Sequence, residues 1–96
     1  MMYESRLKCE ETDRLFEALL SLNSVEEYYR FFEDLCTIGE IKAMSQRLAV
    51  AKMLSEGKTF AEISEMTGVS TATITRVNKC LSYGSGGYQS VLHTER

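Results

Sequence analysis

The stretch from Thr59 to Lys79, TFAEISEMTGVSTATITRVNK, constrains the fold more than any other part of the chain. Thr59 and Glu62 have the spacing of a capping box, which predicts that a helix begins there. Gly68 predicts the end of that helix, because glycine adopts the left-handed backbone of a helix end at little cost. Val69 would then fill the angle between two closely crossing helices. The stretch therefore predicts a helix-turn-helix over residues 59–81.

Apolar side chains predict how the two helices of this motif pack. Phe60 and Ile63 would form the inward face of the first helix. The second helix would begin at Ser70, and with about 100° per residue its apolar positions fall on one stripe. That stripe consists of Ile74, Val77 and Leu81.

The opposite face of the second helix is short, hydroxylated and basic, with Ala72, Thr75, Arg76 and Lys79. Threonine can bond to base edges or phosphates, and arginine and lysine can reach guanine or phosphate. This face therefore predicts contact with the major groove of DNA. The alternative is an ordinary corner between two helices, which also needs a glycine, an apolar plug and a capping hydroxyl.

Length and composition favour one all-helical domain. A chain of 96 residues with 44% hydrophobic residues and no proline fits this class, but a folded chain of this size buries only part of its surface, so a partner chain would help. The sequence contains no apolar run long enough for a membrane span and no signal peptide, which predicts a cytoplasmic protein. Three cysteines fit neither a disulfide framework nor a zinc site, and we expect reduced packing residues at Cys9, Cys36 and Cys80.

The charge is distributed unevenly along the chain. The formal net charge is −3, but residues 1–40 carry net −6 and residues 41–83 carry net +3. Basic charge near the motif is the expected footprint of a DNA-binding protein, although a weak one. The acidic N-terminal part leaves a different function open, an adaptor that recruits a basic protein partner. An enzyme is not predicted, because no carboxylate is paired with a nucleophile, a histidine or metal-ligand spacing.

Other helices are predicted on both sides of the motif. The whole chain is predicted to contain five or six helices. The first runs from Glu10 to Leu22, the second begins at Ser24, and the third runs from Thr37 to Glu56. The aromatic stripe of the second helix is predicted to be core. The third helix is apolar around much of its circumference, which predicts a neighbour from a second subunit and thus a homodimer.

The last residues are rich in glycine. Gly84, Gly86 and Gly87 predict that residues 84–96 form a flexible tail without a stable helix, following a helical domain of residues 1–83. Tyr88, Val91 and Leu92 could instead form a short docked end. The lone His93 has no companion ligand for a metal.

The run from Thr37 to Leu81 resembles the Trp repressor family, most closely its YerC/YecD-type Trp-repressor-like proteins. The most specific segment is ATITR from Ala72 to Arg76, joined at nearly the family's spacing to Thr37, Glu40, Ala43 and Arg47. The resemblance implies an intertwined all-helical homodimer that reads successive major grooves and regulates transcription. It also implies base-facing positions, which are Ser70, Thr71, Ala72, Thr73 and Thr75.

The resemblance further implies a pocket for a small-molecule effector. Thr37, Arg47 and Arg76 correspond to ligand-contacting positions of the tryptophan-responsive members. Val77 and Cys80, however, replace a glycine and a serine, and a β-branched side chain fills space that an indole ring needs. We therefore expect DNA binding that does not require L-tryptophan, with any other effector unspecified. The alternative for both arginines is a phosphate contact or a salt bridge.

Overall fold

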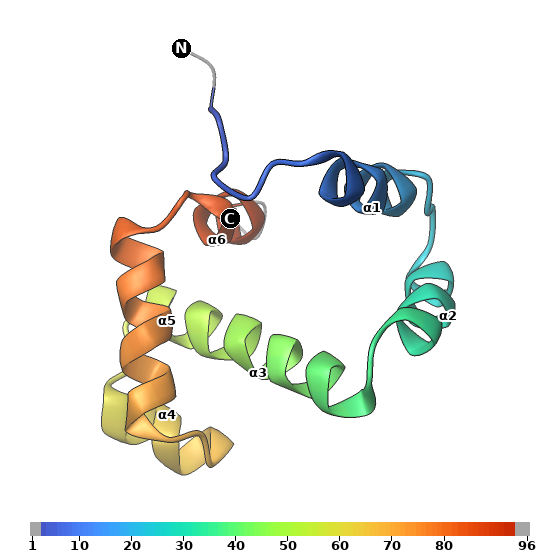
Figure 1. Cartoon of the computed structure of the whole chain (residues 1–96). Helices are drawn as coiled ribbons and strands as arrows, with labels where there is room; N and C mark the ends of the chain where they lie inside the picture. Colours follow the sequence, from blue (N-terminus) through green and yellow to red (C-terminus); the bar gives the residue numbers. More distant parts are fainter. Residues whose placement is uncertain (1–2, 94–96) are drawn as a thin grey trace. The chain divides into compact units, whose positions relative to one another are not determined.

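The structure is a computed structural model that describes residues 3–93, and this part of the chain contains six helices and no strand (Figure 1). The prediction of an all-helical protein with five or six helices is confirmed. None of these helices is long and apolar enough to cross a membrane. The helices are α1 (Glu10–Leu20), α2 (Val25–Leu35), α3 (Ile38–Ser55), α4 (Phe60–Thr67), α5 (Thr71–Tyr83) and α6 (Gly87–His93).

The chain divides into two compact units, Met1–Thr37 with α1 and α2, and Ile38–Arg96 with α3 to α6. In the first unit, α1 ends two residues before the predicted Leu22. Ser21 ends it, because its hydroxyl and its backbone N–H both bond to the carbonyl oxygen of Ala18. The predicted cap of α2 is confirmed, since Ser24 Oγ accepts the N–H of Glu27 at 3.2 Å. The Glu27 carboxylate, however, accepts from Asn23 N at 2.6 Å.

The aromatic stripe of α2 is not core in this chain, so that prediction is wrong for the single subunit. Neither α1 nor α2 contains a buried residue. Val25 is 72% exposed and Tyr29 is 63% exposed. Each helix has only 11 residues, and the unit supplies no third layer that could cover both of them. The apolar faces of these helices are therefore left available.

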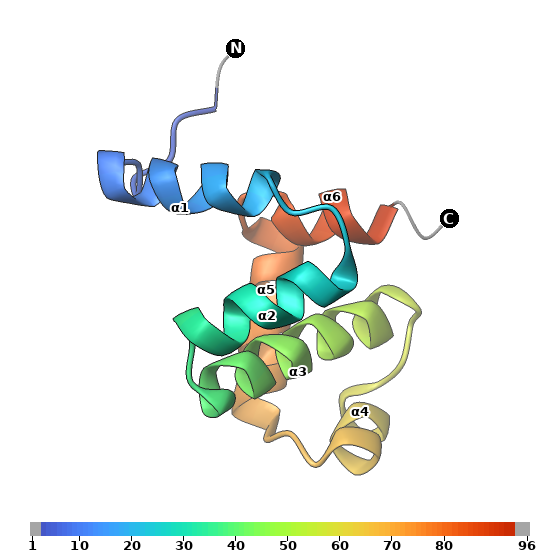
Figure 2. The ribbon, with the colours of Figure 1, turned by 90° about the vertical axis from the view of Figure 1, so that its right-hand side faces the viewer.

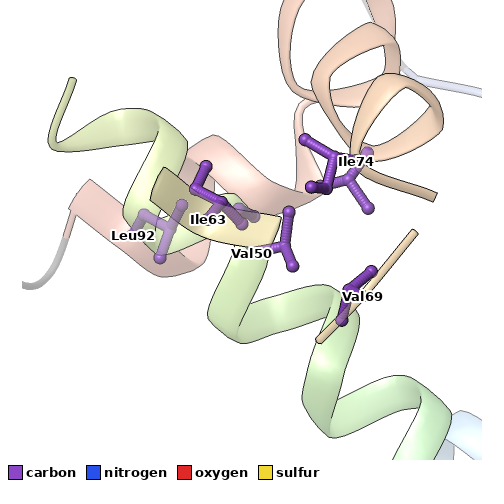
Figure 3. Packing of buried hydrophobic residues seen from close by; sticks show 7 residues of the cluster. Val50, Ile63, Val69, Ile74 and Leu92 are labelled. Carbon is purple, nitrogen blue, oxygen red and sulfur yellow. The ribbon is translucent and has the colours of Figure 1, made fainter. Parts of the chain in front are cut away.

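The buried core lies in the second unit, where α5 runs across α3 and contacts α4 and α6 as well (Figures 1 and 2). Every described helix of this unit contributes at least one apolar side chain. The predicted stripe of α5 is confirmed, because Ile74 and Val77 are buried and Leu81 packs partly buried beside them. The core cluster consists of Val50, Ala51, Ile63, Val69, Ile74, Val77 and Leu92 (Figure 3).

Only the C-terminal half of α3 supplies buried residues. Val50 and Ala51 are fully buried, whereas Met44 is 38% exposed and Leu48 is 43% exposed. The apolar circumference of α3 is thus only partly covered by the helices of its own unit.

The helix-turn-helix is built as predicted. Thr59 Oγ1 accepts from Glu62 N at 3.1 Å, while the Glu62 carboxylate accepts from Thr59 N at 2.8 Å, which completes the capping box. Gly68 has φ +73° in the left-handed region, and Val69 is only 7% exposed. Phe60 does not lie inward as predicted but is 37% exposed, because α4 spans eight residues and turns only Ile63 fully into the core.

The prediction that the glycines preclude a helix after residue 84 is wrong. Residues Gly87–His93 form α6, and Leu92 is buried, which confirms the alternative of a short docked end. The glycines lie before α6 or at its first position, where they cost little, rather than inside it. The last three residues of the predicted tail lie outside the described residues.

Gly68→Ala should lower the free energy of unfolding by about 1 kcal/mol, because alanine is strained at positive φ. A Cβ there would meet no atom within 4 Å, so the loss of stability would measure backbone strain alone. Gly68→Asn should lose less, since asparagine tolerates the left-handed region. Chemical denaturation at one fixed protein concentration measures both values, and an alanine variant as stable as wild type would contradict this account.

Candidate nucleic-acid interface

One face of α5 is exposed along the length of the helix. Thr71, Ala72, Thr75, Arg76 and Lys79 are all exposed, on the side opposite the buried Ile74 and Val77. The burial of the apolar stripe therefore decides which side chains point outward. The result is a surface of small and hydroxylated residues bordered by two cations.

Two of the predicted base-facing hydroxyl groups are engaged in building α5 itself. Ser70 Oγ accepts the N–H of Thr73 at 3.3 Å, which is the N-cap of the helix. The hydroxyl of Ser70 also donates to Thr73 Oγ1 at 3.2 Å, and Thr73 is half-buried. The structure thus separates the predicted set, with Ser70 and Thr73 supporting the helix start and Thr71 and Thr75 exposed on the outward face.

A carboxylate at the start of α4 is held by the motif. The pKa of Glu62 is lowered, because its carboxylate accepts a hydrogen bond from the backbone N–H of Thr59. An interaction with the hydroxyl group of Thr59 lowers this pKa further. Because its pKa is lower in the folded state, Glu62 stabilises the fold at pH values above the ordinary pKa of glutamate. This contribution is lost as the pH falls through the pKa of Glu62 in the folded protein. Near neutral pH, Glu62 is therefore ionised and serves the capping box.

The family model described as Trp repressor protein matches residues 10–96. The chain belongs to the Trp repressor family. It is 53% identical over 91 residues to the protein YerC of Bacillus subtilis (strain 168), described as uncharacterized, and the match covers 95% of this chain and 88% of that protein.

Solved structures of the family have the same fold. A TrpR-like protein from Eubacterium eligens ATCC 27750 is 53% identical and superimposes with a TM-score of 0.89, over 93% of this chain and 92% of the other. A candidate Trp repressor from Staphylococcus aureus is 45% identical with a TM-score of 0.90, over 99% and 95% of the two chains. The predicted resemblance to the Trp repressor family and its fold is confirmed.

The residues implied for an effector pocket differ in their burial. Val77 is 2% exposed and belongs to the core, whereas Arg47, Arg76 and Cys80 are exposed. Thr37 belongs to the other unit. A cavity of about 450 Å³ does occur, but it lies in the first unit and is lined by Tyr3, Ser5, Leu7, Lys8, Thr12, Asp13 and Phe16.

The residues that hold the C-terminal end of α5 were not predicted from the sequence. Gln89 Nε2 of α6 donates to the carbonyl oxygen of Leu81 at 3.0 Å. Gly84 lets the chain leave α5 tightly, because a Cβ there would collide with the carbonyl oxygen of Cys80. The available signal was the spacing of Tyr88 and Leu92, which predicts one inward helical face, but three nearby glycines outweighed it.

The division of the hydroxyl groups can be tested by comparing Ser70→Ala with Thr75→Ala. Loss of the cap should reduce stability by about 1 kcal/mol in Ser70→Ala. Thr75→Ala should leave the melting temperature unchanged and alter discrimination at one base pair by about 1 to 3 kcal/mol. Thermal melting and binding to a panel of single-substitution DNA sites measure the two effects. Equal effects of both variants on base preference would contradict the assignment of Ser70 to the helix start and of Thr75 to the outward face.

Proposed function

We propose that this protein is a sequence-specific DNA-binding transcription regulator that represses by occupying an operator. The observation that carries the proposal is the exposed face of Thr71, Ala72, Thr75, Arg76 and Lys79 on the second helix of a complete helix-turn-helix. Membership of the Trp repressor family supports the same function.

The dimensions and the side chains of α5 suit the major groove. A helix with its side chains is about 10 to 12 Å across, and the groove is about 12 Å wide. Thr71, Ala72 and Thr75 are short, so the helix could approach the base edges closely. Arg76 and Lys79 are long and could reach phosphates or guanine at the sides of the groove. Short residues would thus select the sequence, and the cations would strengthen binding.

The active species in this proposal is a homodimer. Exposed apolar residues occupy both helices of the first unit and the N-terminal half of α3, including Phe16, Leu20, Tyr29 and Met44. A second copy of the chain would cover such faces and supply the burial that a small subunit lacks. Two copies of α5 could then read half-sites about 34 Å apart, one turn of DNA.

An adaptor that recruits a basic partner through α1 and α2 is the second candidate, suggested by the acidity of residues 1–40. The acidic surface is partly compensated within each helix, since Glu10 pairs with Arg14 at 3.5 Å and Glu26 with Arg30 at 2.9 Å. This pairing reduces the charge that a basic partner would meet. The adaptor hypothesis expects no selection among DNA sequences.

The proposal predicts selective binding to genomic DNA fragments, measured by gel shift and fluorescence anisotropy. Lys79→Ala should weaken binding to all sequences similarly and reduce the slope of log affinity against log salt by about one unit per subunit contact. Lys8→Ala is the control, because Lys8 pairs with Asp13 in the first unit. Absence of any sequence selection by the wild-type protein would reject the proposed function in favour of the adaptor.

Homodimerisation predicts a melting temperature that falls when the protein is diluted, because association and folding would be coupled. Light scattering should give twice the mass of the 10.9 kDa chain. Leu20→Glu, at a position 82% exposed in the single chain, should dissociate the dimer if this face is covered by the second copy. A monomeric mass with a melt that does not depend on concentration would contradict the homodimer.

DNA binding should not require L-tryptophan, because Val77 occupies the core where a ring would need space. Calorimetric titration of the protein with tryptophan should show no micromolar binding, and the anisotropy of labelled operator should be the same with and without it. Val77→Gly serves as the comparison, since it removes the obstructing side chain. Micromolar affinity of the wild-type protein coupled to tighter DNA binding would show that the interpretation of Val77 is wrong.

A further inference from the structure

The C-terminal end of α5 is held by the helix that follows it. The carbonyl groups in the last turn of a helix have no partner within the helix. Gln89 of α6 supplies one from outside, since its Nε2 donates to the carbonyl oxygen of Leu81 at 3.0 Å. Gly84 N donates to the carbonyl oxygen of Cys80 at 2.8 Å. Two neighbouring carbonyls at the end of α5 are thus satisfied by the turn and by α6.

The helix that carries Gln89 is itself anchored. Leu92 is 9% exposed and joins Val50 of α3 and Ile63 of α4 in the core cluster (Figure 3). Tyr88 packs partly buried against the same cluster. Because α6 contacts both α3 and α5, it links the end of α5 to the helix that α5 crosses.

The orientation of α5 therefore depends on contacts at three places. The turn from α4 holds its start, Ile74 and Val77 hold its middle against α3, and α6 holds its end. Leu81 lies six residues beyond Thr75, about 9 Å along the axis. A helix is stiff over this length, so a tilt at Leu81 also moves the exposed face that contains Thr75.

We propose that Gln89 is a positioning residue for DNA recognition, because its bond to the Leu81 carbonyl, together with the tight turn at Gly84, sets the angle at which α5 presents its outward face. This inference rests on the proposed DNA-binding function. Gln89 itself need not touch DNA. Its side chain acts through the orientation of the reading helix.

The first test compares the full-length proteins Gln89→Met and Ser24→Ala. Methionine has nearly the shape of glutamine but cannot donate to the carbonyl, and Gln89 is exposed, so the fold should survive. Ser24→Ala also removes one hydrogen bond between a side chain and the backbone at a helix end, in which Ser24 Oγ accepts from Glu27 N at the start of α2, and it serves as the control. Residual dipolar couplings measured by NMR give the angle between α5 and α3 without DNA, and anisotropy gives the affinity for a selected genomic site.

Gln89→Met should change the angle between α5 and α3 and weaken DNA binding by about 3- to 10-fold, because returning α5 to its binding orientation would cost about as much as the lost hydrogen bond contributed. The order of preference among bases and the salt dependence should remain as in wild type, because no contact with DNA is removed. Ser24→Ala should change neither the angle nor the affinity at temperatures well below its melting point.

Glycine substitutions provide a second, independent pair of variants. Gly84→Ala should open the turn and weaken DNA binding more than Gln89→Met, because its Cβ would collide with the Cys80 carbonyl oxygen. Gly87→Ala is the matched control, since a Cβ there meets no atom within 4 Å. It should bind DNA like wild type.

An unchanged angle between α5 and α3 in Gln89→Met would overturn the inference, whatever the affinities and whatever the angle in Gly84→Ala. Unchanged DNA affinity despite a changed angle would also overturn it. If the wild-type protein selects no DNA sequence, the proposed function fails, and the role assigned to Gln89 in recognition fails with it. The angle measured without DNA would still show whether α6 orients α5, which distinguishes the two failures.

Discussion

The packing of α5 on α3 is the interaction on which the rest of the second unit depends. Ile74 and Val77 meet Val50 and Ala51 in a cluster from which water is excluded. Burial of each of the larger apolar side chains contributes about 1.5 to 3 kcal/mol. Because this contact fixes which side of α5 is hidden, it also fixes which side is presented to a partner.

The turn between α4 and α5 and the helix α6 complete this arrangement from opposite ends. Gly68 permits the tight turn, and Val69 fills the angle that the turn creates. At the other end, Leu92 brings α6 into the same core and Gln89 bonds to α5. The outward face of α5 is thus held by three other helices, and such rigidity would suit the proposed recognition of base edges.

The first unit has the opposite character. Its helices α1 and α2 are well capped or internally hydrogen-bonded, yet they bury no residue within this chain. Local signals are therefore sufficient to form these helices, while their apolar faces are not buried. This exposure suits the proposed homodimer, because the apolar faces that are exposed in one subunit would be buried against the second.

The sequence by itself determined the features that depend on neighbours along the chain. Capping at Thr59, Ser24 and Ser70, the left-handed Gly68 and the stripe of Ile74 and Val77 were all predictable, because hydrogen bonds and helical periodicity act within a few residues. The outward face of α5 followed from the same periodicity.

Tertiary structure decided what depended on residues far apart in the chain. A helix forms after the three glycines because Leu92 is buried in the core beside residues of α3 and α4. No pattern of neighbouring residues encodes that contact. Phe60 and the aromatic stripe of α2 were predicted to be core, but Phe60 is exposed and the stripe is exposed or half-buried, because an apolar side chain is buried only where another element covers it. Which hydroxyls build α5 and which face outward was likewise decided by the conformation around Ser70 and Thr73, since residue type alone does not distinguish a capping hydroxyl from an outward-facing one.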